Sequence, residues 1–125
     1  MLAGAGLMAF LPTDDLERAQ RFFSEVIGLS LISHDPYGCI FDANGTQLRV
    51  NLVAPFDRPP HTVLGWLVPD IAAATGALSA RGVHFERYEG MGQDSAGVWT
   101  APSGDRVSWF KHPDGNTLSL TQSAE

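Results

Sequence analysis

Residues 111–120, KHPDGNTLSL, contain the pattern that decides the fold. Asp114-Gly115 is typical of a tight turn, because glycine adopts positive φ without steric cost. After the turn, polar residues alternate with Leu118 and Leu120. This alternation predicts a strand with one apolar and one polar face, which leaves the turn as the second arm of a hairpin.

An earlier stretch repeats this design. Residues 44–52, NGTQLRVNL, again place a turn dipeptide before a strand, whose polar face carries Gln47, Arg49 and Asn51 in alternation with aliphatic residues. When the two stretches are aligned on their glycines, Arg49 corresponds to Ser119. We interpret the chain as a tandem repeat, and these polar strand positions as the places where ligand-binding chemistry would lie.

The first repeat has a strand and a helix ahead of its hairpin. An apolar strand is expected over residues 7–11, and a helix is expected to begin with Asp14 as N-cap and to end at Gly28. Two further strands are expected over residues 29–34 and 38–42 before the hairpin strand.

The second repeat follows the same order. A strand is expected over residues 62–68, and a helix runs from Asp70 to Gly82 with nearly the spacing of the first. Further strands are expected at residues 83–88, 98–100 and 106–111, with a glycine-rich loop from residue 89 to 97.

These elements predict an α+β fold made of two tandem βαβββ modules, residues 1–55 and 61–122, within a single domain of residues 1–125. Asp57-Arg58-Pro59-Pro60 is the expected linker, because two prolines stiffen it and remove ladder donors. One βαβββ unit leaves one sheet face exposed. Two units are therefore expected to form a half-open, cup-like mixed sheet with helices outside, and a chain this short is expected to form a homodimer.

Composition excludes several classes of partner. The chain has a formal net charge of −6 and no cluster of Lys and Arg, so nucleic acid and anionic membranes are poor partners. Its apolar runs are shorter than the roughly 18 residues of a membrane span, and no basic segment precedes the apolar start, so a signal peptide is not expected. The single Cys39 cannot form an internal disulfide. We expect a cytoplasmic protein.

Several local strings point to a known family. They are DLERA at residues 15–19, FF at 22–23, IGL at 27–29, DIAA at 70–73, RGV at 81–83 and FKHPDGN at 110–116. Together with the repeat, they resemble the vicinal oxygen chelate superfamily, which includes glyoxalase I, bleomycin-resistance proteins and extradiol dioxygenases. His112 stands where that family usually has Asp. The resemblance covers nearly the whole chain and implies the fold more than the activity, because the superfamily hosts unrelated chemistries.

The resemblance also implies positions for metal ligands, where metal-using members carry His, Gln or Glu. Here these positions hold Met8, Arg49, Val63 or Leu64, and Ser119. A divalent metal needs several imidazole, carboxylate or thiolate donors, and an arginine would repel it. The sequence therefore predicts no metal and no cofactor. His61 precedes the fifth strand, and whether it joins a non-standard site stays open.

The candidate ligand-binding residues lie on the predicted strands; they are Met8, Phe10, Gln47, Arg49, Asn51, Trp66, Trp99 and Ser119. A guanidinium on a polar strand face binds a carboxylate or phosphate in bidentate fashion, although Arg49 has the alternative of pairing with Asp42 or reaching solvent. The tryptophans are either core residues or an aromatic wall for a planar ligand. Tyr88, Met91 and Gln93 border the loop expected to form a rim. No residue pattern indicates a catalytic group.

Two functions from different classes follow. The first is a metal-free protein of the glyoxalase/bleomycin-resistance type that binds a small aromatic or carboxylated molecule. The alternative is a metal-dependent glyoxalase-like lyase, isomerase or dioxygenase whose ligands come from His61, Gln47 or Glu86. A third hypothesis, an accessory domain that binds a regulator, has no residue pattern in its favour.

Overall fold

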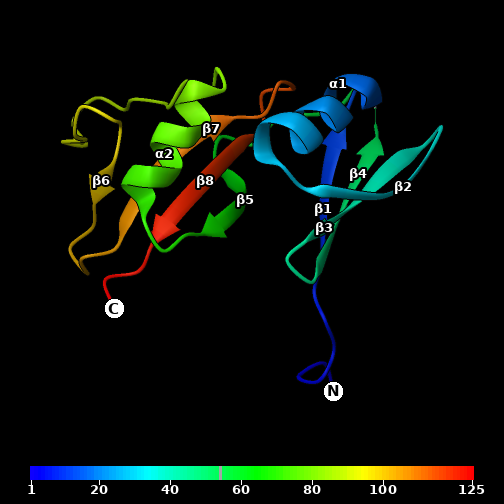
Figure 1. Cartoon of the computed structure of the whole chain (residues 1–125), viewed down its shortest axis with the longest axis horizontal. Helices are drawn as coiled ribbons and strands as arrows, with labels where there is room; N and C mark the ends of the chain where they lie inside the picture. Colours follow the sequence, from blue (N-terminus) through cyan, green and yellow to red (C-terminus); the bar gives the residue numbers. More distant parts are fainter. Residues whose placement is uncertain (54) are drawn as a thin grey trace. The chain divides into compact units, whose positions relative to one another are not determined.

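The computed structural model describes residues 1–53 and 55–125, and the chain divides into two compact units, Met1–Asp57 and Arg58–Glu125 (Figure 1). The expected modules 1–55 and 61–122 lie within these units. Each unit contains a four-stranded mixed sheet, so the predicted α+β class is confirmed.

The first unit follows the expected order of strand, helix and three strands. Its elements are β1 (Met8–Thr13), α1 (Leu16–Arg21), the π-helix η1 (Phe22–Ile27), β2 (Ser30–Asp35), β3 (Gly38–Ala43) and β4 (Thr46–Leu52). The strand order is β1-β4-β3-β2, with β1 parallel to β4 and the other pairs antiparallel. The hairpin between β3 and β4 turns at Asn44-Gly45, and both residues have positive φ, as this dipeptide predicts.

The second unit repeats this topology. Its elements are β5 (Thr62–Leu67), α2 (Ile71–Ala80), β6 (Trp99–Thr100), β7 (Arg106–Lys111) and β8 (Thr117–Gln122). The order is β5-β8-β7-β6, again with the first strand parallel to the last. The two hairpin strands recognised in the sequence therefore occupy equivalent places, at the second position of their sheets.

The first helix begins one residue later than expected. Asp15, not Asp14, is the N-cap: its backbone is extended and its carboxylate accepts a hydrogen bond from the Arg18 N–H at 3.1 Å. Asp14 instead forms an ion pair with the Arg18 guanidinium at 3.1 Å. The helix widens into η1 after Arg21 and ends at Gly28, whose φ of 88° is the left-handed conformation expected of a C-terminal glycine.

The expected strand at residues 83–88 does not form. The segment makes one isolated bridge, between Phe85 and Phe110, and the Glu86 N–H donates to the Trp109 carbonyl at 2.7 Å. Two further backbone groups bond to a side chain: the Tyr88 N–H donates to Gln93 Oε1 at 2.7 Å, and Gln93 Nε2 donates to the Glu86 carbonyl at 2.9 Å. These bonds replace a strand ladder, which is why the apolar alternation here was misleading.

One face of each sheet is covered by the helices of its own unit. In the first unit, Leu48, Val50 and Phe41 are buried on that face, and α1 packs against β3 and β4. The Phe23 ring lies 5.6 Å from that of Phe41. In the second unit, α2 packs against β7 and β8, over Phe110, Leu118 and Leu120. We call the other face of each sheet, the one away from the helices, the outer face. The polar strand positions lie on this face.

Candidate functional site

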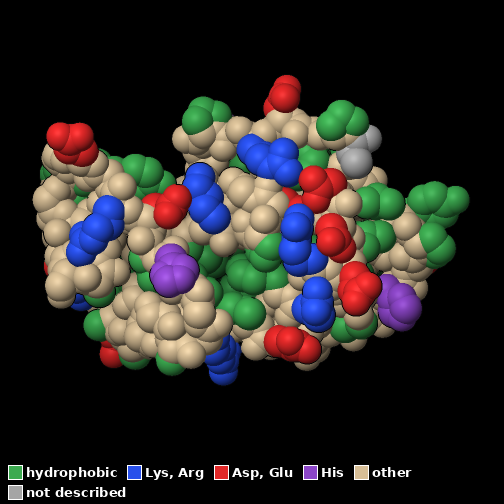
Figure 2. All heavy atoms as spheres, turned by 90° about the horizontal axis from the view of Figure 1, so that it is seen from above, with side chains coloured by type: hydrophobic (Ala, Val, Ile, Leu, Met, Phe, Trp, Pro, Cys, Tyr) green, Lys and Arg blue, Asp and Glu red, His purple; other side chains and the backbone are tan. Residues whose placement is uncertain are grey.

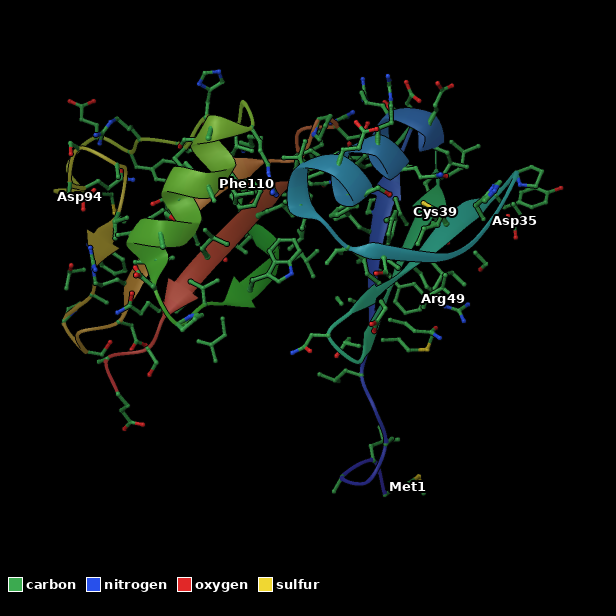
Figure 3. All side chains as sticks on the ribbon, viewed as in Figure 1. Met1, Asp35, Cys39, Arg49, Asp94 and Phe110 are labelled. Carbon is green, nitrogen blue, oxygen red and sulfur yellow. The ribbon has the colours of Figure 1, made fainter. Side chains whose placement is uncertain are left out.

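In the first unit, five of the predicted site residues share the outer face: Met8, Phe10, Gln47, Arg49 and Asn51. Met8 pairs with Gln47, and Phe10 with Arg49, and side chains at paired positions of neighbouring strands lie on the same face. Figure 3 shows Arg49 on the side of the sheet away from the helix, with Cys39 toward the helix. Met8 and Phe10 are 45% and 58% exposed. Apolar side chains therefore flank the arginine on an open surface.

Asn51 lies further along the same face. It pairs with Pro12 on β1 and with Gly38 on β3, and it is exposed. An alanine-type Cβ at Gly38 would come within 2.8 Å of the Val50 carbonyl, so only glycine fits beside Asn51 at this point. Gln47, Arg49 and Asn51 therefore form a row of polar side chains along β4.

Arg49 lacks a carboxylate partner among the described residues. Its Nη2 donates one long hydrogen bond, 3.4 Å, to Gln47 Oε1, and its Nε is buried without a hydrogen bond. The carboxylate of Asp42, the alternative partner considered from the sequence, accepts from the Gly45 N–H at 2.9 Å in the hairpin turn. A half-buried guanidinium without a counter-ion is desolvated at a cost, which an anionic ligand would offset.

In the second unit, Trp99 and Ser119 share the outer face, whereas Trp66 does not. Ser119 pairs with Gly65, and Trp99 pairs with Val107, which is two residues before the Ser119 partner Trp109. Trp66 pairs with Leu120 and stacks on Phe110, with ring centroids 6.4 Å apart and planes at 18°. The structure therefore places Trp66 on the helix-covered face, and we leave it out of the candidate site.

Sequence reasoning did not include Trp109 among the site residues. Trp109 lies opposite Ser119 on the outer face, and its ring contacts Trp99 at 6.1 Å and Tyr88 at 5.5 Å. The sequence alone would have misplaced it, because a two-residue turn at Asp114-Gly115 pairs Trp109 with Leu120. The structure has a three-residue loop, residues 113–115, closed by the His112 N–H bond to the Asn116 carbonyl, and this register sets Trp109 opposite Ser119.

Two groups have a raised pKa. Burial, and then the negative charge of Glu86, raise the pKa of the Tyr88 phenol, which keeps its hydroxyl protonated and able to donate a hydrogen bond. Burial raises the pKa of the Cys39 thiol, which is 2% exposed on the helix-covered face. Cys39 is therefore a poor nucleophile, as the absence of an activating motif indicated.

Potential metal-ligating side chains are scattered rather than grouped in the described part of the chain. Within residues 1–53 and 55–125, no three His, Cys, Asp or Glu side chains come together as a ligand group. Of the positions implied by the family resemblance, Met8 and Arg49 offer no hard anionic donor, and Val63 is the extra residue of a bulge in β5. His61 lies with Nδ1 3.0 Å from the Thr62 carbonyl.

His112 is a structural residue of the second hairpin. It is 1% exposed, its Nδ1 accepts from the Asp114 N–H at 3.1 Å, and the same nitrogen lies 3.2 Å from Asp114 Oδ2. The backbone N–H of His112 donates to the Asn116 carbonyl at 2.9 Å, and the Gly115 N–H donates to the backbone carbonyl of His112 at 2.7 Å. The imidazole thus braces the turn between β7 and β8.

The model of the family described as the Glyoxalase/Bleomycin resistance protein/Dioxygenase superfamily matches residues 7–120. The chain belongs to this superfamily. The resemblance expected from the sequence is therefore confirmed. The comparison of this chain with curated proteins found no match.

Solved structures show the same fold for this glyoxalase-superfamily chain. A superfamily member from Sphaerobacter thermophilus superposes with a TM-score of 0.75 at 23% identity, covering 98% of this chain and 100% of that one. A lactoylglutathione lyase from Agrobacterium tumefaciens gives 0.76 at 17% identity, over 99% and 97% of the two chains. TioX from Micromonospora sp. ML1 gives 0.72 at 18% identity, over 95% and 98%. At such identities the likeness concerns the fold alone.

The surface and the helices give two further findings. On the face of each unit that Figure 2 shows, Lys and Arg side chains are interspersed with Asp and Glu, a mixture that does not favour a polyanionic partner. Among the described residues, no helix combines the length and the apolar character that crossing a membrane requires.

Proposed function

We propose that this superfamily member binds an anionic small molecule on the outer face of its first sheet, without a metal centre. The observation that supports the proposal is the state of Arg49: a half-buried guanidinium with one 3.4 Å hydrogen bond and no carboxylate partner among the described residues. A carboxylate of the ligand would accept two parallel hydrogen bonds from it and neutralise its charge.

The neighbours of Arg49 define the rest of the ligand. Met8 and Phe10 are exposed apolar side chains on the adjacent strand, so they favour a carbon skeleton beside the acid group. Gln47 and Asn51, two residues to either side on β4, supply neutral hydrogen-bonding amides. The arrangement favours a carboxylated organic molecule over inorganic phosphate, which has no apolar part to bury.

A metal-dependent reaction is not favoured by any contact in the site. The cationic Arg49 occupies one of the positions that the resemblance assigns to a metal ligand, and it would repel a divalent ion placed beside it. Sequestration of a ligand needs only the groups already present. The proposed function is therefore binding.

The test is a thermal-shift screen of carboxylated aromatic metabolites against the native protein and two variants. We expect acids that raise the melting temperature of the native protein to lose that shift in Arg49→Ala. The matched control is Arg21→Ala, which removes an exposed arginine at the end of α1, on the helix side of the same unit. An acid-induced shift that persists unchanged in Arg49→Ala would contradict the proposal.

A further inference from the structure

On the outer face of the second sheet, the Trp109 ring contacts two other aromatic rings, those of Tyr88 and Trp99. The Tyr88 ring meets Trp109 edge-on, with centroids 5.5 Å apart and planes at 77°, and the Trp99 ring lies 6.1 Å from Trp109 with planes at 34°. Trp99 and Trp109 are half-buried and Tyr88 is 41% exposed, so the group, which we call the aromatic step, keeps indole surface open. Rings held in this way cannot rotate freely, which lowers the entropy lost when a planar ligand stacks on them.

Next to the aromatic step, the outer face of the sheet carries two small residues, Gly65 and Ser119. Gly65 is exposed and pairs with Ser119, which in turn pairs with Trp109. A Cβ on Gly65 would stand 2.6 Å from Ser119 Oγ, so the serine hydroxyl already occupies the space that a side chain at position 65 would need. The result is a low floor with one hydroxyl, next to a wall of indole rings.

The loop that carries Tyr88 is fixed by its own hydrogen bonds. Gln93 binds the Tyr88 N–H and the carbonyls of Glu86 and Gly97, the last at 2.7 Å. Asp94 Oδ1 accepts from the N–H groups of Ala96 and Val98, both at 2.9 Å. Tyr88 is therefore held against Trp109 by a preformed loop, and its raised pKa keeps the phenol a hydrogen-bond donor.

We infer that the aromatic step is a subsite for a planar aromatic ring, which stacks on the Trp99–Trp109 pair and lies over the Gly65–Ser119 floor. The inference goes beyond the proposed function, because it assigns a ring subsite that lies within the second unit alone and does not require Arg49. A saturated ring can contact an indole face only through its C–H groups, whereas a flat aromatic ring also gains the quadrupole interaction between two aromatic rings.

The experiment follows the three indole N–H signals of the ¹⁵N-labelled protein by NMR, assigned with Trp66→Phe, Trp99→Phe and Trp109→Phe. Three probes are titrated: 2-naphthoate, the neutral 2-naphthalenemethanol, and cyclohexanecarboxylate. We expect both naphthalene probes to shift the Trp99 and Trp109 signals. The Trp66 signal serves as internal control, since its ring stacks on Phe110 on the other face of the sheet.

Variants separate the ring subsite from the acid subsite. We expect Trp109→Leu to weaken 2-naphthoate binding by about three- to tenfold, the range of an aromatic pair, and Trp109→Phe to retain most of it. Should Trp109→Leu fail to fold, Trp99→Leu is the second variant, with the same expectation. Arg49→Ala, in the first unit, should weaken binding of 2-naphthoate and cyclohexanecarboxylate at the acid subsite but leave the binding of 2-naphthalenemethanol at the aromatic step unchanged.

The outcomes distinguish the two claims. If the neutral naphthalene probe leaves the Trp99 and Trp109 signals in place up to its solubility limit, or moves only Trp66, the aromatic subsite is overturned. If the neutral probe binds as expected while both acids are insensitive to Arg49→Ala, the acid subsite of the proposed function fails and the aromatic subsite stands.

Discussion

His112 is buried in the turn between β7 and β8, where its Nδ1 is the acceptor for the Asp114 N–H. Replacing it with leucine keeps the volume but leaves that buried N–H without its acceptor. We expect His112→Leu to lower the free energy of unfolding by about 1–3 kcal/mol, the cost of an unsatisfied buried polar group. Urea denaturation measures it, with His112→Asn, whose side-chain oxygen can accept the same bond, as the conservative control. Equal losses in both variants would count against this role.

The Cys39 thiol is expected to be unreactive in the folded protein. Burial raises its pKa, so the thiol stays protonated to higher pH than in the unfolded chain; this contribution to stability is complete below the unfolded pKa and is lost as pH rises through the folded one. Because the thiolate is the nucleophile, a thiol reagent at mildly alkaline pH should label the native protein far more slowly than the urea-unfolded protein. Equal labelling rates would show that Cys39 is accessible.

At the scale of single residues, the sequence predicted which face of a strand a residue lies on where polar and apolar residues alternate, but not where the strand is mostly apolar. The alternation of β4 placed Gln47, Arg49 and Asn51 on one face, and the register of the structure has them there. Trp66 was a candidate because an indole can form an aromatic wall, and the mostly apolar run at residues 62–67 has no alternation that indicates its face. Only the pairing with β8 shows which face each residue takes.

At the scale of the element, the loop after residue 86 depends on Gln93. Its side chain makes three hydrogen bonds to the backbone, at Tyr88, Glu86 and Gly97. We expect Gln93→Leu to open this loop, and the Tyr88 amide to exchange with solvent at least about tenfold faster, which corresponds to about 1.4 kcal/mol. Ser95→Ala, an exposed loop position, is the matched control. Unchanged exchange at Tyr88 in Gln93→Leu would mean that the loop is held by other contacts.

The sequence predicted elements well where turn chemistry bounded them. Both hairpins were found because their turns need positive φ, at Asn44 and Gly45 in the first and at Gly115 in the second, and the helix end at Gly28 has the same cause. The strand expected at residues 83–88 has no such turn. Two of its backbone groups bond to the side chain of Gln93, a partner five residues beyond Tyr88 that no periodic pattern could indicate. The change from α1 to the π-helix η1 likewise has no signal in the spacing of apolar residues.

For the whole molecule, we expect no stoichiometric metal. The purified protein, incubated with Ni, Zn, Fe and Mn salts in turn and then dialysed, should retain well below one metal per chain, because the described residues offer no group of three suitable donors. Elemental analysis by mass spectrometry measures it. One tightly held metal per chain would contradict the proposed function and favour the enzymatic alternative.

The repeat was the most reliable signal at this scale. Two turn-and-strand stretches with the same spacing predicted two units of equal topology, and the sheets have equivalent strand orders. The linker at residues 57–60 coincides with the boundary between the units. The cup, the homodimer and the cytoplasmic location stay predictions. They depend on contacts between surfaces or on cellular context, neither of which alternation and turn chemistry encode.

The parallel pairing of β1 with β4, and of β5 with β8, also bears on biosynthesis. Met8 has no strand to pair with until Gln47 has been made, and two other strands of its sheet are synthesised in between. Because loop closure must precede such distant contacts, the β2–β3–β4 meander should assemble first and β1 should dock last. The segment that leaves the ribosome earliest is thus the one that waits longest for its neighbour.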